Sequence, residues 1–255
     1  MKALILAAGE GTRLRPYTAD RPKCLVEVAG RSLLDRQLDV LGAAGVAPVV
    51  VVGGYRAEML PRPGIEVLLN PRYATTNMVT TLFCAEEALA GGALVCYGDI
   101  VYARDMVEAV LASDADIAVA IDLAWEAYWR ARGEDPLADA ETLRLNADDR
   151  ILEIGQKPSS LDQIEGQYMG LMKFSANGAE ILRSAYHGAM AQGSLRGKPV
   201  EKAYMTDLLQ HLVDLGHRVQ AVPVCGDWVE VDTVGDLNLA ITRERLQRIQ
   251  AKNQT

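Results

Sequence analysis

Residues 6–25, LAAGEGTRLRPYTADRPKCL, combine the residue types that the binding of a triphosphate requires. Gly9 and Gly11 allow the backbone to turn sharply and to present bare N–H groups to phosphate oxygens. Arg13 and Lys23 add two cations that can hydrogen-bond phosphate. An apolar run, residues 3–8, precedes the turn and is typical of a strand buried on both faces, so the loop would follow the carboxyl end of that strand. The segment is interpreted as a loop that binds a nucleoside triphosphate.

Two common nucleotide-binding loops fit this pattern less well. Leu14 stands where a dinucleotide fingerprint needs its third glycine, and the Lys-Ser/Thr pair of a P-loop is absent. A plain turn with Arg13 and Arg15 as surface charges would account for the glycines alone. The fixed spacing of Arg13, Pro22 and Lys23 after the turn favours the binding loop.

Three acidic residues lie at or beside the ends of predicted strands. Asp99 follows the apolar run 94–97, and Glu230 and Asp232 in WVEVD alternate onto one face of a strand. Mg²⁺ takes a few carboxylate oxygens together with waters and substrate phosphates, so two or three such side chains suffice. Alone, a Gly-Asp pair is a common turn and Glu-x-Asp a common solvated face. Beside a triphosphate loop, the three acids predict a Mg²⁺ site.

The elements that must position these residues alternate along the chain between strands and helices. Hydrophobic periodicity predicts strands over 3–8, 47–53, 65–69, 93–97, 116–122, 168–174 and 219–224, and helices over 32–44, 79–89, 178–192 and 204–215. A hairpin is predicted for 142–145 and 151–154, and mainly helix from 234 onward. The alternation indicates an α/β fold with a doubly wound, mostly parallel sheet and ligands at its carboxyl edge.

Composition limits the classes of function. The 255 residues, 49% hydrophobic and 24% charged, fit a single domain over 1–255 with a sizeable core. The formal net charge of −8 argues against a nucleic-acid partner, and no run is long and apolar enough for a membrane span. Four scattered cysteines predict reduced thiols, and the lack of a signal-peptide pattern predicts a cytoplasmic location. The sequence leaves open whether the chain forms a homo-oligomer.

The motif LAAGxGTRLxPxT followed by PKxL resembles the signature of nucleoside triphosphate transferases that act on sugar phosphates and phosphorylated alcohols. The resemblance covers most of the chain and implies a Rossmann-like nucleotidyltransferase fold. It implies catalytic roles for Arg13 and Lys23, whose counterparts neutralise charge during attack at the α-phosphorus. It also implies a nucleotide site made of Leu6, Ala8, Gly9, Gly11, Thr12, Gly53 and Asn77. For Asn77, which precedes a predicted helix, an N-cap is an equal alternative.

Two further segments extend the resemblance. YGDIVY is similar to the segment that bears the metal-binding aspartate, and WVEVDTVGDL to the late segment that bears a second ligand, which implies Asp99 and Asp232 as ligands and Glu230 as a third. The Glu-x-Asp pattern and NPRYATTNMVTTLFCAEEAL resemble the branch of cytidylyltransferases for phosphocholine and related non-sugar acceptors.

Acceptor recognition is predicted in residues 123–175, interpreted as an insertion over the mouth of the site. Trp125 and Trp129 suit either an aromatic cage for a quaternary ammonium or core packing of helical neighbours. Asp139 and Glu141 in the DAET segment suit an amino group, as in an amino-acid phosphate or aminoethylphosphonate. The predicted acceptor residues are Trp125, Trp129, Arg132, Glu141, Lys157 and Tyr168, with the arginine and Lys157 directed to phosphate.

Together these features predict a Mg²⁺-dependent cytidylyltransferase that moves CMP from CTP to a small phosphorylated non-sugar acceptor and releases pyrophosphate. A sugar-1-phosphate uridylyl- or thymidylyltransferase is the main alternative. A nucleotide-sensing subunit without catalysis is a weaker one, because the chain keeps both cations and the acids.

Overall fold

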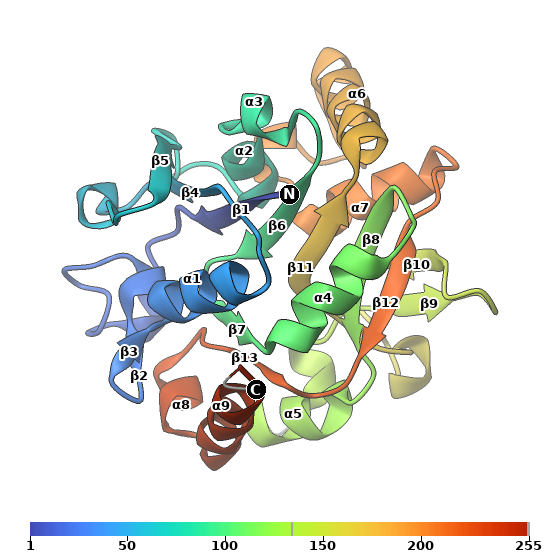
Figure 1. The fold of residues 1–255 in the computed structure, drawn as a ribbon. Coiled ribbons are helices and arrows are strands. Elements are labelled where there is room, and N and C mark those ends of the chain that lie inside the picture. Colours follow the sequence, from blue (N-terminus) through green and yellow to red (C-terminus); the bar gives the residue numbers. More distant parts are fainter. Residues whose placement is uncertain (134, 254–255) are drawn as a thin grey trace.

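A computed structural model describes residues 1–133 and 135–253, and a seven-stranded sheet runs through its centre (Figure 1). Its strand order is β12-β8-β11-β6-β1-β4-β5. All neighbouring pairs are parallel except those of β11, which runs antiparallel to both β6 and β8. The strands are β1 (Lys2–Ala7), β4 (Val49–Gly53), β5 (Ile65–Leu69), β6 (Ala93–Tyr97), β8 (Ile117–Asp122), β11 (Gln167–Phe174) and β12 (Gln220–Val224). The predicted mostly parallel α/β fold is confirmed.

Helices cover both faces of this sheet, which is why β1 is apolar at every position from Ala3 onward. Ala3 and Ile5 pack into the core under α1 (Leu33–Ala43) and α4 (Arg104–Ala112). Leu4 and Leu6 alternate with them and pack under α2 (Met78–Phe83), α6 (Ala176–Gln192) and α7 (Met205–Asp214). Because successive side chains of a strand point to opposite faces, a strand between two helical layers needs apolar residues throughout.

Small sheets and helices at the edge complete the fold. β7 (Ile100–Tyr102) pairs antiparallel with β13 (Trp228–Glu230), and β13 leads into α8 (Val234–Asn238) and α9 (Ala240–Asn253). β2 (Glu27–Val28) pairs with β3 (Arg31–Ser32) in the loop after β1. The β7–β13 pairing matters most for the site, because it places the late WVEVD segment beside Asp99, which lies in the turn after β6.

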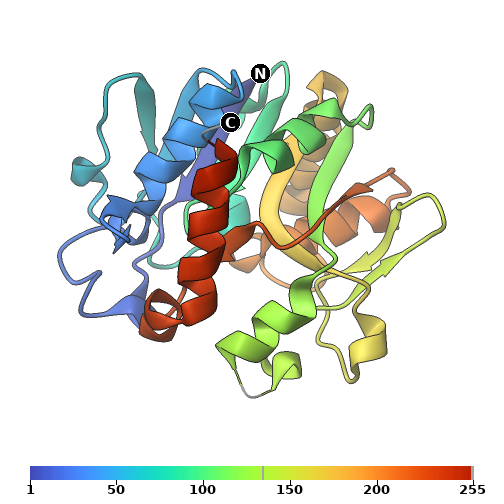
Figure 2. The same cartoon turned by 60° about the horizontal axis from the view of Figure 1, so that its bottom comes forward.

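The predicted insertion, 123–175, leaves the sheet and then returns to it. It contains α5 (Trp125–Arg132) and the hairpin of β9 (Leu143–Leu145) and β10 (Ile151–Ile154), which project from the lower edge of the sheet in Figure 2. The same range also includes β11, which pairs with β6 and β8 inside the central sheet. The excursion therefore ends before Gln167.

Most predicted elements appear within a few residues of their expected bounds, with two differences. The single helix predicted over 79–89 is two helices, α2 and α3 (Glu86–Leu89), because the chain turns at Ala85, whose φ of −113° and ψ of 30° are not helical. Helix α4 and strand β7 were not predicted. Among the described residues, no helix has the length and apolarity to cross a membrane. The cytoplasmic location stays a prediction.

Candidate active site

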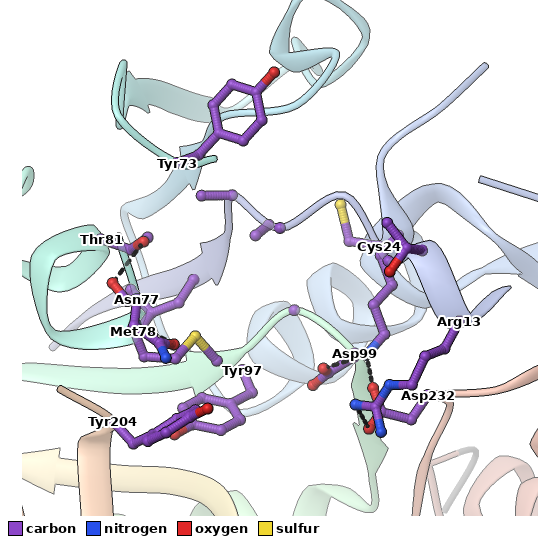
Figure 3. A pocket seen from close by; sticks show the side chains of 18 of the residues that line it. Arg13, Cys24, Tyr73, Asn77, Met78, Thr81, Tyr97, Asp99, Tyr204 and Asp232 are labelled. Atoms are coloured by element: carbon purple, nitrogen blue, oxygen red, sulfur yellow. Dashed lines mark hydrogen bonds and ion pairs between the residues drawn. The ribbon is translucent and has the colours of Figure 1, made fainter. Parts of the chain in front are cut away.

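A cavity of about 410 Å³ lies at the carboxyl ends of β1 and β6, and is called the main cavity here (Figure 3). One wall is the loop after β1, the opposite wall is the start of α2, and the floor is the turn after β6. It is lined by Leu6, Ala7, Ala8, Gly9, Gly11, Thr12, Arg13, Lys23, Cys24, Tyr73, Thr76, Asn77, Met78, Thr81, Tyr97, Gly98, Asp99, Tyr204, Glu230 and Asp232. The structure thus brings the predicted loop, cations and acids to one place.

The loop after β1 folds tightly against the segment that carries Lys23. Gly11 has a φ of +62°, and a Cβ there would lie 3.0 Å from the Cβ of Lys23 and 3.2 Å from Cγ2 of Thr18. Thr18 Oγ1 donates a hydrogen bond of 2.8 Å to the Gly11 carbonyl. Only glycine meets both the left-handed backbone and the close approach at this position. The glycine therefore positions the lysine as well as shaping the loop.

The cations and acids of the site pair with one another. Lys23 Nζ donates to Asp99 Oδ2 at 2.6 Å and also to Asp232 Oδ1, and Arg13 donates to Asp232 Oδ2 at 2.6 Å. Burial by itself would lower the pKa of Lys23, but the two carboxylates outweigh it and raise that pKa above its usual range. Burial opposes ionisation of Asp232, but Lys23 and Arg13 lower its pKa overall. The four side chains thus form one connected cluster of ion pairs.

Pairing of strands far apart in sequence places Asp232 beside Asp99. The Val231 N–H donates to the Asp99 carbonyl at 3.0 Å and continues the β7–β13 ladder. Asp236 then holds the next turn, because its carboxylate accepts from the N–H groups of Asp232 at 2.9 Å and Thr233 at 2.7 Å. Asp236 is buried and was not predicted. Its signal was the Thr-x-x-Asp spacing of a capping box at the start of α8.

Glu230 lines the main cavity next to these acids and binds an arginine of α5. Its Oε2 accepts from Arg132 Nη1 at 2.5 Å. Burial raises the pKa of Glu230 to about 7, with Asp232 and Asp99 adding to the effect and Arg132 opposing it. The third predicted metal ligand is therefore already occupied by an arginine.

The donor set around Asp99 and Asp232 fits a hard divalent cation that the substrate helps to bind. Asp99 Oδ1 is buried and has no hydrogen-bond partner among the described residues. Within residues 1–133 and 135–253, no three His, Cys, Asp or Glu side chains are arranged to hold a metal ion by themselves. Mg²⁺ commonly takes only one or two protein carboxylates and completes its shell with phosphates and waters. The residues present fit such a site.

The opposite wall of the main cavity carries polar and aromatic residues suited to a nucleoside. Asn77 caps α2 by accepting from the Met78 N–H at 2.9 Å, and it also lines the cavity, so its two predicted roles coexist. Asn70 donates to Thr76 Oγ1 and Thr81 Oγ1, both at 3.0 Å, and so holds two hydroxyl groups at this wall. Tyr73, Tyr97 and Tyr204 also line the cavity and were not predicted.

Gly53, predicted in the nucleotide site, points into the core instead. A Cβ on Gly53 would meet Leu60 Cδ1 at 2.4 Å and Ala57 Cβ at 3.0 Å. The next residue packs closely against two residues that line the cavity, because a Cβ on Gly54 would lie 2.7 Å from the Ala8 carbonyl oxygen and 2.5 Å from Tyr73 Cβ. Gly54 thus allows the backbone behind the loop to approach the cavity wall.

The predicted aromatic residues of α5 belong to the core. Trp125 and Trp129 are 5% and 6% exposed and pack edge to face, with ring centroids 6.0 Å apart. Trp129 also packs against Tyr128 and Trp228. Neither indole lines the main cavity. The arrangement matches the core-packing alternative and offers no aromatic cage at the main cavity.

The other predicted acceptor residues lie around this region but have distinct contacts. Lys157 donates to the carbonyls of Leu137 and Ala138, in the turn after α5. Tyr168 packs edge to face on Tyr97, with centroids 5.6 Å apart. Burial raises the pKa of Glu141 to about 7, with the charge of Asp207 as the next cause. Of these three, none lines the main cavity directly.

The fold and the cation–acid cluster define a nucleotidyltransferase, and sequence comparison agrees. Residues 3–164 match the MobA-like NTP transferase domain, and the chain belongs to this family. It is 36% identical to the CTP:phosphoglutamine cytidylyltransferase of Campylobacter jejuni over 254 residues, which cover 95% of this chain and 100% of the relative. It is 36% identical to the choline-phosphate cytidylyltransferase of Streptococcus pneumoniae over 99 residues, 37% of this chain and 43% of the relative.

Solved structures show the same fold. The inositol-1-phosphate CTP transferase of T. maritima matches with a TM-score of 0.74 and 20% identity, over 99% of this chain and 96% of the other. The CTP:phosphocholine cytidylyltransferase of Streptococcus pneumoniae matches with a TM-score of 0.69 and 21% identity, over 98% of both chains. The predicted family and enzyme class are confirmed.

Proposed function

We propose that this enzyme transfers CMP from CTP to a small phosphorylated non-sugar acceptor, with Mg²⁺ bound at Asp99 and Asp232, and releases pyrophosphate. The observation that carries the proposal is the cluster of Arg13, Lys23, Asp99 and Asp232 beside the glycine loop. The choice of CTP is supported by the cytidylyltransferase of Campylobacter jejuni, which aligns over its full length.

The proposed reaction is a direct in-line displacement. An oxygen of the acceptor phosphate attacks the α-phosphorus of CTP, a new P–O bond forms, and the bond to the bridging oxygen breaks as pyrophosphate leaves. The attacking oxygen is already anionic, so no side chain has to remove a proton. Catalysis then rests on positioning and on stabilisation of the phosphate charge.

The residues of the main cavity supply both contributions. Lys23 and Arg13 are fixed at the loop that would hold the triphosphate, and their charge offsets the negative charge that gathers on the phosphates. Mg²⁺ held by the two aspartates would add further positive charge. Tyr97 and Tyr204 line the same cavity on the side of Asn77 and Met78, across from the Arg13–Asp232 pair in Figure 3.

The alternatives draw less support from the molecule. A uridylyltransferase for N-acetylmuramate 1-phosphate from Caulobacter vibrioides is 57% identical, but over only 58 residues, 23% of this chain. A match over so small a share of the chain supports no choice of acceptor. A nucleotide-sensing subunit without activity is disfavoured, because the two cations and two aspartates are present and converge.

Pyrophosphate release in the presence of Mg²⁺ tests the proposal. CTP, UTP, dTTP, ATP and GTP are each combined with phosphocholine, phosphoethanolamine, aminoethylphosphonate, an amino-acid phosphate and glucose 1-phosphate. We expect turnover with CTP and a non-sugar acceptor, and its loss in the Asp99→Asn variant. Turnover with UTP or dTTP and the sugar phosphate would contradict the proposal, as would full activity of Asp99→Asn.

A further inference from the structure

A second cavity, of about 160 Å³, lies beside the main cavity and shares Arg13 with it. It sits between the chain that follows α5 and the start of α8. It is lined by Arg13, Trp129, Arg132, Gly133, Asp135, Ala138, Asp139, Thr233 and Asp236. Figure 3 shows Arg13 and Asp232 at one side of the main cavity, and Arg13 is the residue that lines both cavities. A molecule whose phosphate lies in the main cavity can therefore extend into the second one.

One side of this second cavity offers hydrogen-bond donors. Trp129 is 6% exposed, and its Nε1 is buried without an acceptor among the residues described. Arg132 Nε donates to Asp236 at 3.1 Å, and its Nη1 donates to Glu230 at 2.5 Å. Its Nη2 has no hydrogen-bond partner among the described residues. A buried donor left without an acceptor is destabilising, so a ligand that accepts from Trp129 Nε1 is favoured, and the same ligand can accept from Arg132.

The chain after α5 offers acceptors. Asp139 forms neither an ion pair nor a side-chain hydrogen bond with any described residue. Asp135 uses Oδ1 to accept from the Leu137 N–H at 2.9 Å, which leaves Oδ2 for a ligand. The arginines of the cavity pair with Asp232, Glu230 and Asp236 instead of these two aspartates. Asp135 and Asp139 therefore line the cavity without an ion pair to either of its arginines.

The aromatic faces near this cavity are already covered by arginines. The guanidinium of Arg132 lies 5.4 Å from the ring centroids of both Tyr128 and Trp129. Arg245 lies 4.0 Å from the centroid of Tyr128. A quaternary ammonium needs open aromatic faces, because it cannot donate an N–H bond. These rings therefore leave it no cage.

We propose that the second cavity binds the α-amino-acid head of the acceptor, an inference that rests on the proposed transferase function. The carboxylate of the head accepts from Trp129 Nε1 and Arg132, and its ammonium donates to Asp139 and Asp135. The carboxylate thereby satisfies a buried donor that the described residues leave unpaired, and the ammonium meets two carboxylates that are exposed to solvent. The acceptor is then a phosphorylated amino acid rather than phosphocholine.

Lys157 acts in this scheme as a positioning residue. By donating to the carbonyls of Leu137 and Ala138 it fixes the short 3-10 helix Pro136–Ala138, which lies between the two aspartates. Its ammonium is thereby committed to the protein chain. A lysine predicted to bind the acceptor phosphate thus contributes to the acceptor site without lining either cavity.

Binding of matched ligands tests the amino-acid head. The probes are O-phosphoserine and O-phosphohomoserine, phosphoethanolamine without the carboxylate, phosphorylated 3-hydroxypropionate without the ammonium, and phosphocholine. Their dissociation constants are measured by calorimetry, and the indole N–H signals are followed by NMR. Trp129→Phe identifies the Trp129 signal, because it replaces the indole, with its N–H, by a smaller ring. Asp139→Asn removes one acceptor charge, and Asp148→Asn, on an exposed turn, is the matched control.

We expect at least one phosphorylated amino acid to shift the Trp129 indole signal, and phosphoethanolamine to leave it in place. Asp139→Asn should weaken that amino acid about tenfold or more, as expected for a charge-assisted hydrogen bond, and should not weaken the probe without an ammonium. Equal binding of the amino-acid and choline probes, or wild-type affinity in Asp139→Asn, would overturn the inference. A shifted indole signal without pyrophosphate release would instead refute the transferase proposal and leave the amino-acid site standing.

Discussion

The Lys23→Met variant tests the central geometry of the site. The Lys23 ammonium lies between Asp99 and Asp232, where a divalent cation bound by both aspartates would lie. Methionine fills a similar volume without a charge. We expect the variant to lose turnover and, in the absence of nucleotide, to bind a divalent cation more tightly than the wild-type enzyme, because the metal no longer competes with an internal cation.

The size of the effect follows from burial. The side chains of Lys23, Asp99 and Asp232 are 15%, 17% and 15% exposed. Removing one member of a buried ion pair costs about 3–5 kcal/mol, and here about 2–3 kcal/mol, because the site opens to a cavity and Arg13 still pairs with Asp232. For a chain of this size that loss lowers Tm by about 4–12 °C. A cation at 100 times its Kd returns about 2.7 kcal/mol, so Mg²⁺ should restore most of the lost stability.

Thermal unfolding with and without Mg²⁺, together with direct Mn²⁺ binding, measures both effects. We expect the Mn²⁺ Kd of the nucleotide-free variant to fall at least tenfold below that of the wild type. Lys202→Met is the matched control, because Lys202 Nζ donates to the Thr75 carbonyl and is exposed. If Lys23→Met bound Mn²⁺ no better than the wild type and gained no stability from Mg²⁺, the two aspartates would not be the metal site.

Three further changes test other parts of the structure. Gly54→Ala should raise the KM for CTP about tenfold, because the new Cβ would lie 2.7 Å from the Ala8 carbonyl oxygen. The control is Gly42→Ala, whose Cβ meets nothing within 4 Å and which should stabilise α1 by about 0.5–1 kcal/mol. Unchanged CTP kinetics in Gly54→Ala would contradict the close approach. Burial raises the pKa of Glu141 from 4.5 to about 7, so its contribution to stability is full below pH 4.5 and is lost as the pH rises through 7. The unfolding free energy of Glu141→Gln relative to the wild type should therefore be about 3 kcal/mol higher at pH 8 than at pH 4. A difference in urea unfolding that does not change with pH would refute this. Lys157→Met should raise the acceptor KM several-fold with the CTP KM unchanged, and equal changes in both KM values would show that the lysine acts elsewhere.

Local patterns in the sequence predicted the elements of the sheet well. Strands that are buried on both faces, such as β1 and β4, appear in the sequence as unbroken apolar runs of the length of a strand. The direction of a strand leaves no such mark, and the antiparallel insertion of β11 between β6 and β8 is visible only in the fold. Tyr204 was missed for a related reason, because it reaches the main cavity from the start of α7, far along the chain from the glycine loop.

The sequence by itself determined the chemistry of the site: the glycine loop, the two cations, and acids at the ends of strands. The tertiary structure alone decided how these groups pair, since Lys23 meets Asp99 and Asp232 across 76 and 209 residues of chain. It also decided that Trp125 and Trp129 pack in the core, because helical spacing is the same for a core stripe and for a binding cage. The type of a side chain limits what it can bind, whereas the groups around it after folding decide which charges and faces remain free.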